Sequence, residues 1–159
     1  MRNLGELNLQ ENGEPVDRPE PTSPQVSFIE ELVGRVLPQS YLQFLKYSNG
    51  GQPEQDTFYF TYNDEQQEWA VDTFFHISSD TGSFNNVVWE YRNRWNDAPR
   101  SFLPIAADGS GNLICLDLSE PGSSKVVLWV HDDPELPLLP VADSFEEFID
   151  SLTINPDYI

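Results

Sequence analysis

The fold is decided by Leu113-Ile114-Cys115-Leu116-Asp117-Leu118, which a short connection joins to Val126-Val127-Leu128-Trp129-Val130. Both runs consist mainly of aliphatic, β-branched and aromatic residues, a composition typical of strands. The connection contains Pro121-Gly122, a turn signal, so we expect the two runs to pair as an antiparallel hairpin. Trp129 should then be at least partly buried.

Two helices are expected before this hairpin. Ser27 and Glu30 have the spacing of a capping box, which marks a helix start. The apolar stripe of this first helix would be Phe28, Ile29, Leu32 and Val36. Pro38 can occupy the first position of a second helix, and Asn49-Gly50-Gly51 should end it, because these residues tolerate the left-handed conformation.

The middle and the end of the chain supply the other predicted elements. Aromatic and β-branched runs at residues 57–62, 69–71 and 74–77 predict strands, and residues 84–96 predict a third helix that Pro99 ends. A last helix should start at Asp143 or Ser144. Helices followed by strands and a final helix indicate an α+β fold, a mainly antiparallel sheet with helices packed on it in a single domain.

The first 24 residues differ in composition from the rest. Four prolines there disfavour a regular helix or a central strand. We therefore expect residues 1–24 to form an extended, acidic, proline-rich arm, either free or docked on the domain through Leu4, Leu7 and Leu9. Residues 25–155 would form the α+β domain, and residues 156–159 a C-terminal tail.

The net charge of −19 comes from 27 acidic and 8 basic residues. Such a surface repels the phosphates of nucleic acids and the headgroups of anionic membranes, and it attracts basic partners. Acidity can also serve solubility alone. A single cysteine and the lack of a signal-peptide-like N-terminus favour a reducing, cytoplasmic location.

Two clusters bear on metal binding, and neither matches a known ligand pattern. Residues 108–112, Asp-Gly-Ser-Gly-Asn, start like a calcium loop, but Leu113 and Ser119 stand where an EF-hand has glycine and glutamate. His131-Asp132-Asp133 is an incomplete zinc set. We interpret the first cluster as a tight turn and the second as a solvated strand exit, and we expect no metal or cofactor.

No motif for catalysis is recognised. Cys115 lies at the centre of a strand, where a cysteine behaves as a small hydrophobic residue. Residues 91–95, Tyr-Arg-Asn-Arg-Trp, with Arg100 form the basic-aromatic cluster of the chain, able in principle to bind a phosphate or an acidic segment. We expect these arginines to pair with surface acids instead, and Trp95 to lie in the core. The chain is not expected to be an enzyme.

Three blocks in this order resemble the SUKH superfamily, which includes fungal Smi/Knr-type regulators and bacterial toxin-immunity proteins. The first is Leu37-Pro38-Gln39-Ser40-Tyr41-Leu42-Gln43-Phe44-Leu45 with Asn49-Gly50-Gly51. The second, residues 103–118, resembles the family's PIA-x-DG-x-GN turn and the strand after it. The third, residues 127–132 and 142–149, resembles the closing strand and helix.

The resemblance implies an α+β domain without catalytic residues or cofactor. It implies either an immunity protein that neutralises a cognate toxin, often a nuclease, or a regulatory scaffold with an endogenous partner. Because a nuclease presents a basic groove, acidic side chains are the candidate partner contacts: Glu54, Asp56, Asp64, Glu65, Asp108, Asp132 and Asp133. For each of them, plain solvation is the alternative.

Overall fold

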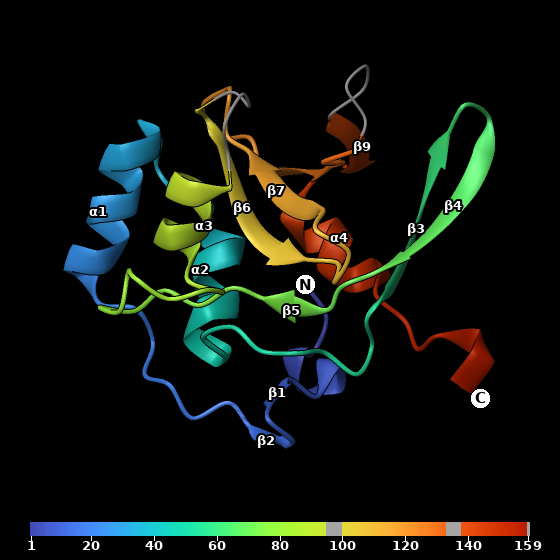
Figure 1. Ribbon diagram of the computed structural model, residues 1–159, viewed down its shortest axis with the longest axis horizontal. Coiled ribbons are helices and arrows are strands. Elements are labelled where there is room, and N and C mark those ends of the chain that lie inside the picture. The colour runs from blue at the N-terminus through green and yellow to red at the C-terminus, as the bar shows by residue number, and fades with distance from the viewer. Residues whose placement is uncertain (95–99, 133–137, 159) are drawn as a thin grey trace.

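A five-stranded antiparallel sheet organises the computed structural model, which describes residues 1–94, 100–132 and 138–158 (Figure 1). Its strand order is β5-β6-β7-β8-β9. The bounds are β5 (Thr73–Phe74), β6 (Phe102–Ala107), β7 (Leu113–Asp117), β8 (Lys125–Trp129) and β9 (Leu138–Ala142). The predicted hairpin is confirmed as β7 and β8, with Cys115 opposite Val127 and with Trp129 half-buried.

Strands β6 and β9 were not predicted as strands, and both contain a proline. Proline cannot donate to a strand ladder, so it is tolerated at bulges and at sheet edges. Pro104 in β6 adjoins a register shift before Ala106, and Pro140 lies in β9, the last strand of the sheet. Pairing with β7 and β8 thus outweighs the local signal against a strand.

Helices α1 (Ser23–Val33) and α2 (Gln39–Tyr47) confirm the two predicted N-terminal helices but correct their boundaries. The capping box of α1 is formed by Thr22 and Gln25, not by Ser27 and Glu30, because Pro24 is compatible with the first helical turn. Gly34 ends the helix, so Val36 is 75% exposed and does not belong to the apolar stripe.

The second and third helices also end and begin differently from the predictions. Pro38 is the N-cap of α2 and not its first residue. Helix α2 ends shortly before Asn49-Gly50-Gly51 as predicted, but its C-cap is Ser48 in an extended conformation. Gly50 and Gly51, at φ of 89° and 115°, shape the turn that follows. Helix α3 (Val87–Asn93) is shorter than predicted. It begins at Val87 because Asn86 is its N-cap, whose side chain accepts from the backbone N–H groups of Val88 and Trp89. Trp95 and Pro99 lie outside the described residues.

Helix α4 (Phe145–Ser151) begins where the sequence predicts, with Ser144 as its N-cap. It closes an aromatic core that joins distant parts of the chain. Phe145 contacts Tyr41 and Phe44 of α2 at ring distances of 5.4 and 5.6 Å. Phe148 contacts Phe58 at 5.2 Å. Such edge-to-face pairs add specific geometry to hydrophobic burial.

Strands β3 (Thr57–Tyr62) and β4 (Glu65–Ala70) form a separate hairpin. Figure 1 shows it extending from the body of the molecule, on the side opposite to α1, α2 and α3. The strand at 57–62 is confirmed, while β4 starts earlier than the predicted run at residue 69. Asn63 and Asp64 both have positive φ, which suits a tight hairpin turn.

The N-terminal residues fold against the domain. They form a 3-10 helix, η1 (Leu4–Leu7), and a short hairpin of β1 (Gln10–Glu11) and β2 (Glu14–Pro15). Leu7 and Leu9 are buried. A second 3-10 helix, η2 (Pro156–Tyr158), follows α4. In the part of the chain that the structure describes, no helix is long and apolar enough to cross a membrane.

Candidate functional site

The Asn-Gly-Gly turn lies against β5 and the N-terminal segment. Gly51 and Phe74 exchange two backbone hydrogen bonds, at 3.1 and 2.8 Å. A Cβ at Gly51 would lie 2.5 Å from Cγ2 of Val16, so only glycine fits this close approach. Gln52 then exchanges two further backbone hydrogen bonds with Gln10. The edge of the sheet is therefore extended, first by the turn and then by the N-terminal hairpin.

Asn49 holds this turn to the loop after β5. Its side chain is buried and bonds both the N–H and the C=O of Ile77, at 2.8 and 2.7 Å. The side chain also donates to the carbonyl of Pro19, and the backbone carbonyl of Asn49 accepts from Arg18. The sequence indicated only a helix stop here. It did not predict that the Asn49 side chain clamps the loop after β5 through these hydrogen bonds.

The second glycine-rich turn, residues 108–112, is closed by its own side chains. Asp108 accepts from the backbone N–H groups of Ser110 and Asn112, at 2.8 and 3.1 Å, and from the Asn112 amide at 2.8 Å. The Asn112 Oδ1 accepts from the backbone N–H of His131 at 3.1 Å. Both carboxylate oxygens of Asp108 are thus engaged within the turn, as expected for a tight turn.

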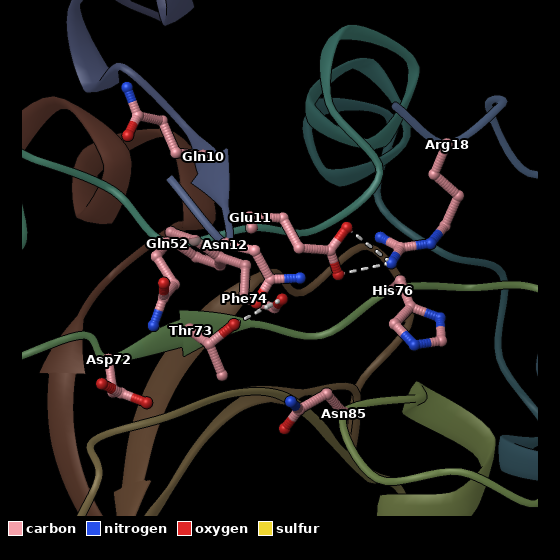
Figure 2. Close-up of a pocket in the computed structure, with 11 residues that line it drawn as sticks. Gln10, Glu11, Asn12, Arg18, Gln52, Asp72, Thr73, Phe74, His76 and Asn85 are labelled. Carbon is pink, nitrogen blue, oxygen red and sulfur yellow. Dashed lines mark hydrogen bonds and ion pairs between the residues drawn. The ribbon is translucent and has the colours of Figure 1, made fainter. Parts of the chain in front are cut away.

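Two adjoining hollows connect these glycine turns. The first, of about 170 Å³, lies between the Asn-Gly-Gly turn, the N-terminal hairpin and β5 (Figure 2). The second, of about 190 Å³, lies between the 108–112 turn and α3. Asp72, Thr73 and Asn85 line both. Because the two hollows share these residues, we describe them together and call them the β5 groove.

Charges inside the β5 groove are partly paired. Arg18 forms an ion pair with Glu11 at 2.6 Å, visible in Figure 2. Burial lowers the pKa of His76, and nearby Arg18 lowers it further, which favours the neutral imidazole. Asp72 is exposed, and in the described part of the chain its carboxylate accepts no hydrogen bond. Asp72 therefore provides an available negative charge in the groove.

Glu90 lies at the floor of the second hollow and is 1% exposed. Burial raises the pKa of its carboxyl, although a hydrogen bond from the backbone N–H of Asn85 and the Arg94 guanidinium at 3.0 Å oppose this. Its contacts hold the loop before α3 to the helix. Glu90 thus lines the second hollow and fixes the loop beside it.

The structure places the predicted acidic contacts in separate regions. Asp132 is exposed and contacts His131, which packs on Gly111, so Asp132 lies beside the 108–112 turn. Glu54 accepts from Asn8 of the N-terminal segment. Asp64 and Glu65 lie at the far turn of the β3–β4 hairpin.

The remaining two acidic candidates complete this set. Asp56 is half-buried and accepts from the hydroxyl of Thr57 at 2.9 Å. Asp133 lies outside the described residues. The structure thus links Asp108 and Asp132 at the 108–112 turn, through Asn112 and His131, and leaves the other described candidates elsewhere.

The basic-aromatic cluster does not behave as expected. Arg92 and Arg100 lie over the rings of Phe28 and Tyr91, at 5.3 and 4.6 Å, instead of pairing with surface acids. Among the described residues of this cluster, only Arg94 pairs with an acid, the buried Glu90. Guanidinium groups stack well on aromatic faces, which competes with weak surface ion pairs.

The groups considered for chemistry lie apart from one another. Cys115 is buried, as predicted, and burial raises the pKa of its thiol well above the usual value, which disfavours the reactive thiolate. Among the described residues, no three His, Cys, Asp or Glu side chains meet in a way that could hold a metal ion.

A larger hollow of about 580 Å³ lies between α1 and α2. Val26, Val36 and Leu42 contribute apolar surface to it, and Glu20, Glu30 and Lys46 contribute the charged groups. Its lining is more apolar than that of the two hollows beside β5.

The comparisons with known proteins agree with this architecture. A model of the SMI1/KNR4 family (SUKH-1) matches residues 20–151. The chain is also 29% identical over 154 residues to a Bacillus subtilis (strain 168) protein described as SPbeta prophage-derived uncharacterized protein YokK. That match covers 85% of this chain and 76% of the relative.

Proposed function

The chain belongs to the SMI1/KNR4 family (SUKH-1), and from this premise we propose that it is a non-catalytic immunity-type protein that neutralises a cognate bacterial toxin by direct binding. The proposed toxin is a nuclease with a basic substrate groove. The observation that carries this proposal is the charge of −19 on a family scaffold. A relative of prophage origin is consistent with an immunity-type role.

Charge complementarity supports a basic protein partner. Glu54, Asp64, Glu65 and Asp132 all keep exposed carboxylates. Such groups can take the place of substrate phosphates in a nuclease groove, and they raise the rate of encounter with a basic protein. The same charge opposes binding to nucleic acid or to an anionic membrane, and we propose a cytoplasmic site of action.

The geometry of the described residues favours binding over catalysis. Cys115 is buried, and burial raises the pKa of its thiol. The buried Glu90 contacts Asn85 and Arg94, and these contacts hold the loop before α3 to the helix. The β5 groove combines a free carboxylate with polar side chains, which suits recognition of another protein. We propose that Asp108 serves the turn that shapes this surface and that Asp132 contacts the partner directly.

The proposal predicts that a nuclease toxin domain is encoded next to the gene for this chain, and this domain is the reagent for its test. We expect the purified chain to bind that domain and to abolish its nuclease activity at an equimolar ratio. Heat-denatured chain serves as the control for nonspecific inhibition. A neighbouring nuclease that neither binds the chain nor loses activity would contradict the proposal, and specific binding to an endogenous non-toxin protein would favour the regulatory alternative.

A further inference from the structure

Three amide side chains in the first hollow have no hydrogen-bond partner in the described part of the chain. They belong to Asn12, Gln52 and Asn85, which Figure 2 shows around Thr73 of β5. The amide groups of Asn49 and Asn112, in contrast, are engaged in the loops that shape the groove. A primary amide both donates and accepts, so it can bind the N–H and C=O of a peptide group together.

The backbone at these three positions is held in place. Gln52 is paired with Gln10 through two hydrogen bonds, at 2.7 and 3.0 Å. Asn85 donates to Glu90, and its carbonyl accepts from His76. Asn12 occupies the β1–β2 turn at a φ of 55°. Fixed backbones lower the entropy cost of binding, since fewer groups must be ordered.

Charge and size indicate what these amides would bind. Asp72 adds a free carboxylate at the junction of the two hollows, and Arg18 is already committed to Glu11 and Asn49. The two hollows, of about 170 and 190 Å³, together reach only the lower end of the roughly 300–1,000 Å³ of small-molecule sites. Two small hollows that share lining residues suit successive residues of a peptide.

We propose that the β5 groove binds an extended segment of the toxin. Asn12, Gln52 and Asn85 bind its backbone, and Asp72 binds an arginine or lysine side chain that enters at the junction of the hollows. This inference rests on the proposed function, because it locates the contact through which the toxin is bound.

The first test compares single charge reversals by affinity for the toxin domain. Asp72→Lys should weaken binding at least about tenfold, as expected for a central contact. Glu146→Lys changes the net charge equally on the exposed face of α4 and should change affinity less than about threefold. Asp72→Asn should weaken binding in the same direction while keeping the shape of the side chain.

Melting curves accompany these measurements, to verify that each variant folds. If Asp72→Lys and Glu146→Lys weaken binding equally, only long-range charge is involved and the groove proposal fails. If the toxin binds all variants like the parent chain, the proposed function stands but the groove is not the contact.

The second test needs no toxin. Nitrogen-15-labelled full-length chain is titrated with acetyl-Gly-Arg-Gly-amide, and the side-chain amide signals of Asn12, Gln52 and Asn85 should shift. Acetyl-Gly-Glu-Gly-amide should cause smaller shifts, because its carboxylate is repelled by Asp72. Shifts confined to the hollow between α1 and α2, or equal shifts with both peptides, would overturn the proposal. Groove shifts without toxin binding would instead reject the proposed function and keep the peptide site.

Discussion

Three buried asparagines shape the loops around the β5 groove. Asn49 clamps the loop after β5, Asn86 caps α3 and donates to the carbonyls of Ser78 and Asp80, and Asn112 ties the 108–112 turn to His131. A buried amide is tolerated only when its donors and acceptors are satisfied, so each position strongly restricts the loop it serves.

Replacing Asn49 with alanine tests this role at the residue scale. The change leaves the backbone N–H and C=O of buried Ile77 without partners. Each buried unsatisfied group costs about 1–3 kcal/mol, so the free energy of unfolding should fall by at least about 2 kcal/mol. Denaturant titration measures this. Gln43→Ala on the exposed face of α2 is the control. If both variants lose an equally small amount of unfolding free energy, Asn49 does not stabilise the loop after β5.

At the scale of elements, the N-terminal segment, for which the sequence left open a free or a docked arm, is packed on the domain. Gln10 and Gln52 continue the sheet beyond β5, and Leu7 is fully buried. Arg2 donates to the carbonyls of Ile149 and Leu152 at the end of α4. A cation there is favourable, because the last carbonyls of a helix lack partners and carry partial negative charge.

Truncation of a leucine in this segment measures how much the segment stabilises the domain. Leu7→Ala should lower the free energy of unfolding by about 2–5 kcal/mol, the range for buried leucines. Leu4→Ala is the matched control, because Leu4 is only half-buried and should cost less. Thermal unfolding provides the comparison. Equal and small losses in both would mean that the segment contributes little to the folded domain.

At the scale of the whole molecule, the excess of negative charge should govern how fast a basic partner arrives. The Debye length falls from about 10 Å at 0.1 M salt to about 3 Å at 1 M, so long-range attraction is screened first. Contacts in a buried interface are screened less, so dissociation should depend less on salt than association.

A surface-binding assay with the toxin domain over a salt series tests this. The association rate should fall steeply as salt rises, and Asp132→Lys beside the 108–112 turn should slow association at low salt. The fold should be unaffected, because Asp132 is exposed. A salt-independent association rate would show that the charge serves solubility, and the mimicry of phosphates would have to be abandoned even if inhibition persisted.

The sequence by itself determined the α+β class, the β7–β8 hairpin, the end of α2 before Asn49-Gly50-Gly51, and the burial of Cys115. These features depend on neighbouring residues, since apolar runs, turn signals and glycine conformations act within a few positions.

Only the tertiary structure decided that β6 and β9 are strands and that a groove exists beside β5. A proline in a strand is tolerated when neighbouring strands pair around it, which no local pattern reveals. The groove brings together Asn12, Gln52, Asp72 and Asn85, from four separate parts of the chain. Exposed amides carry no periodic signal in a sequence, so their convergence is fixed by strand pairing and loop clamps between distant residues.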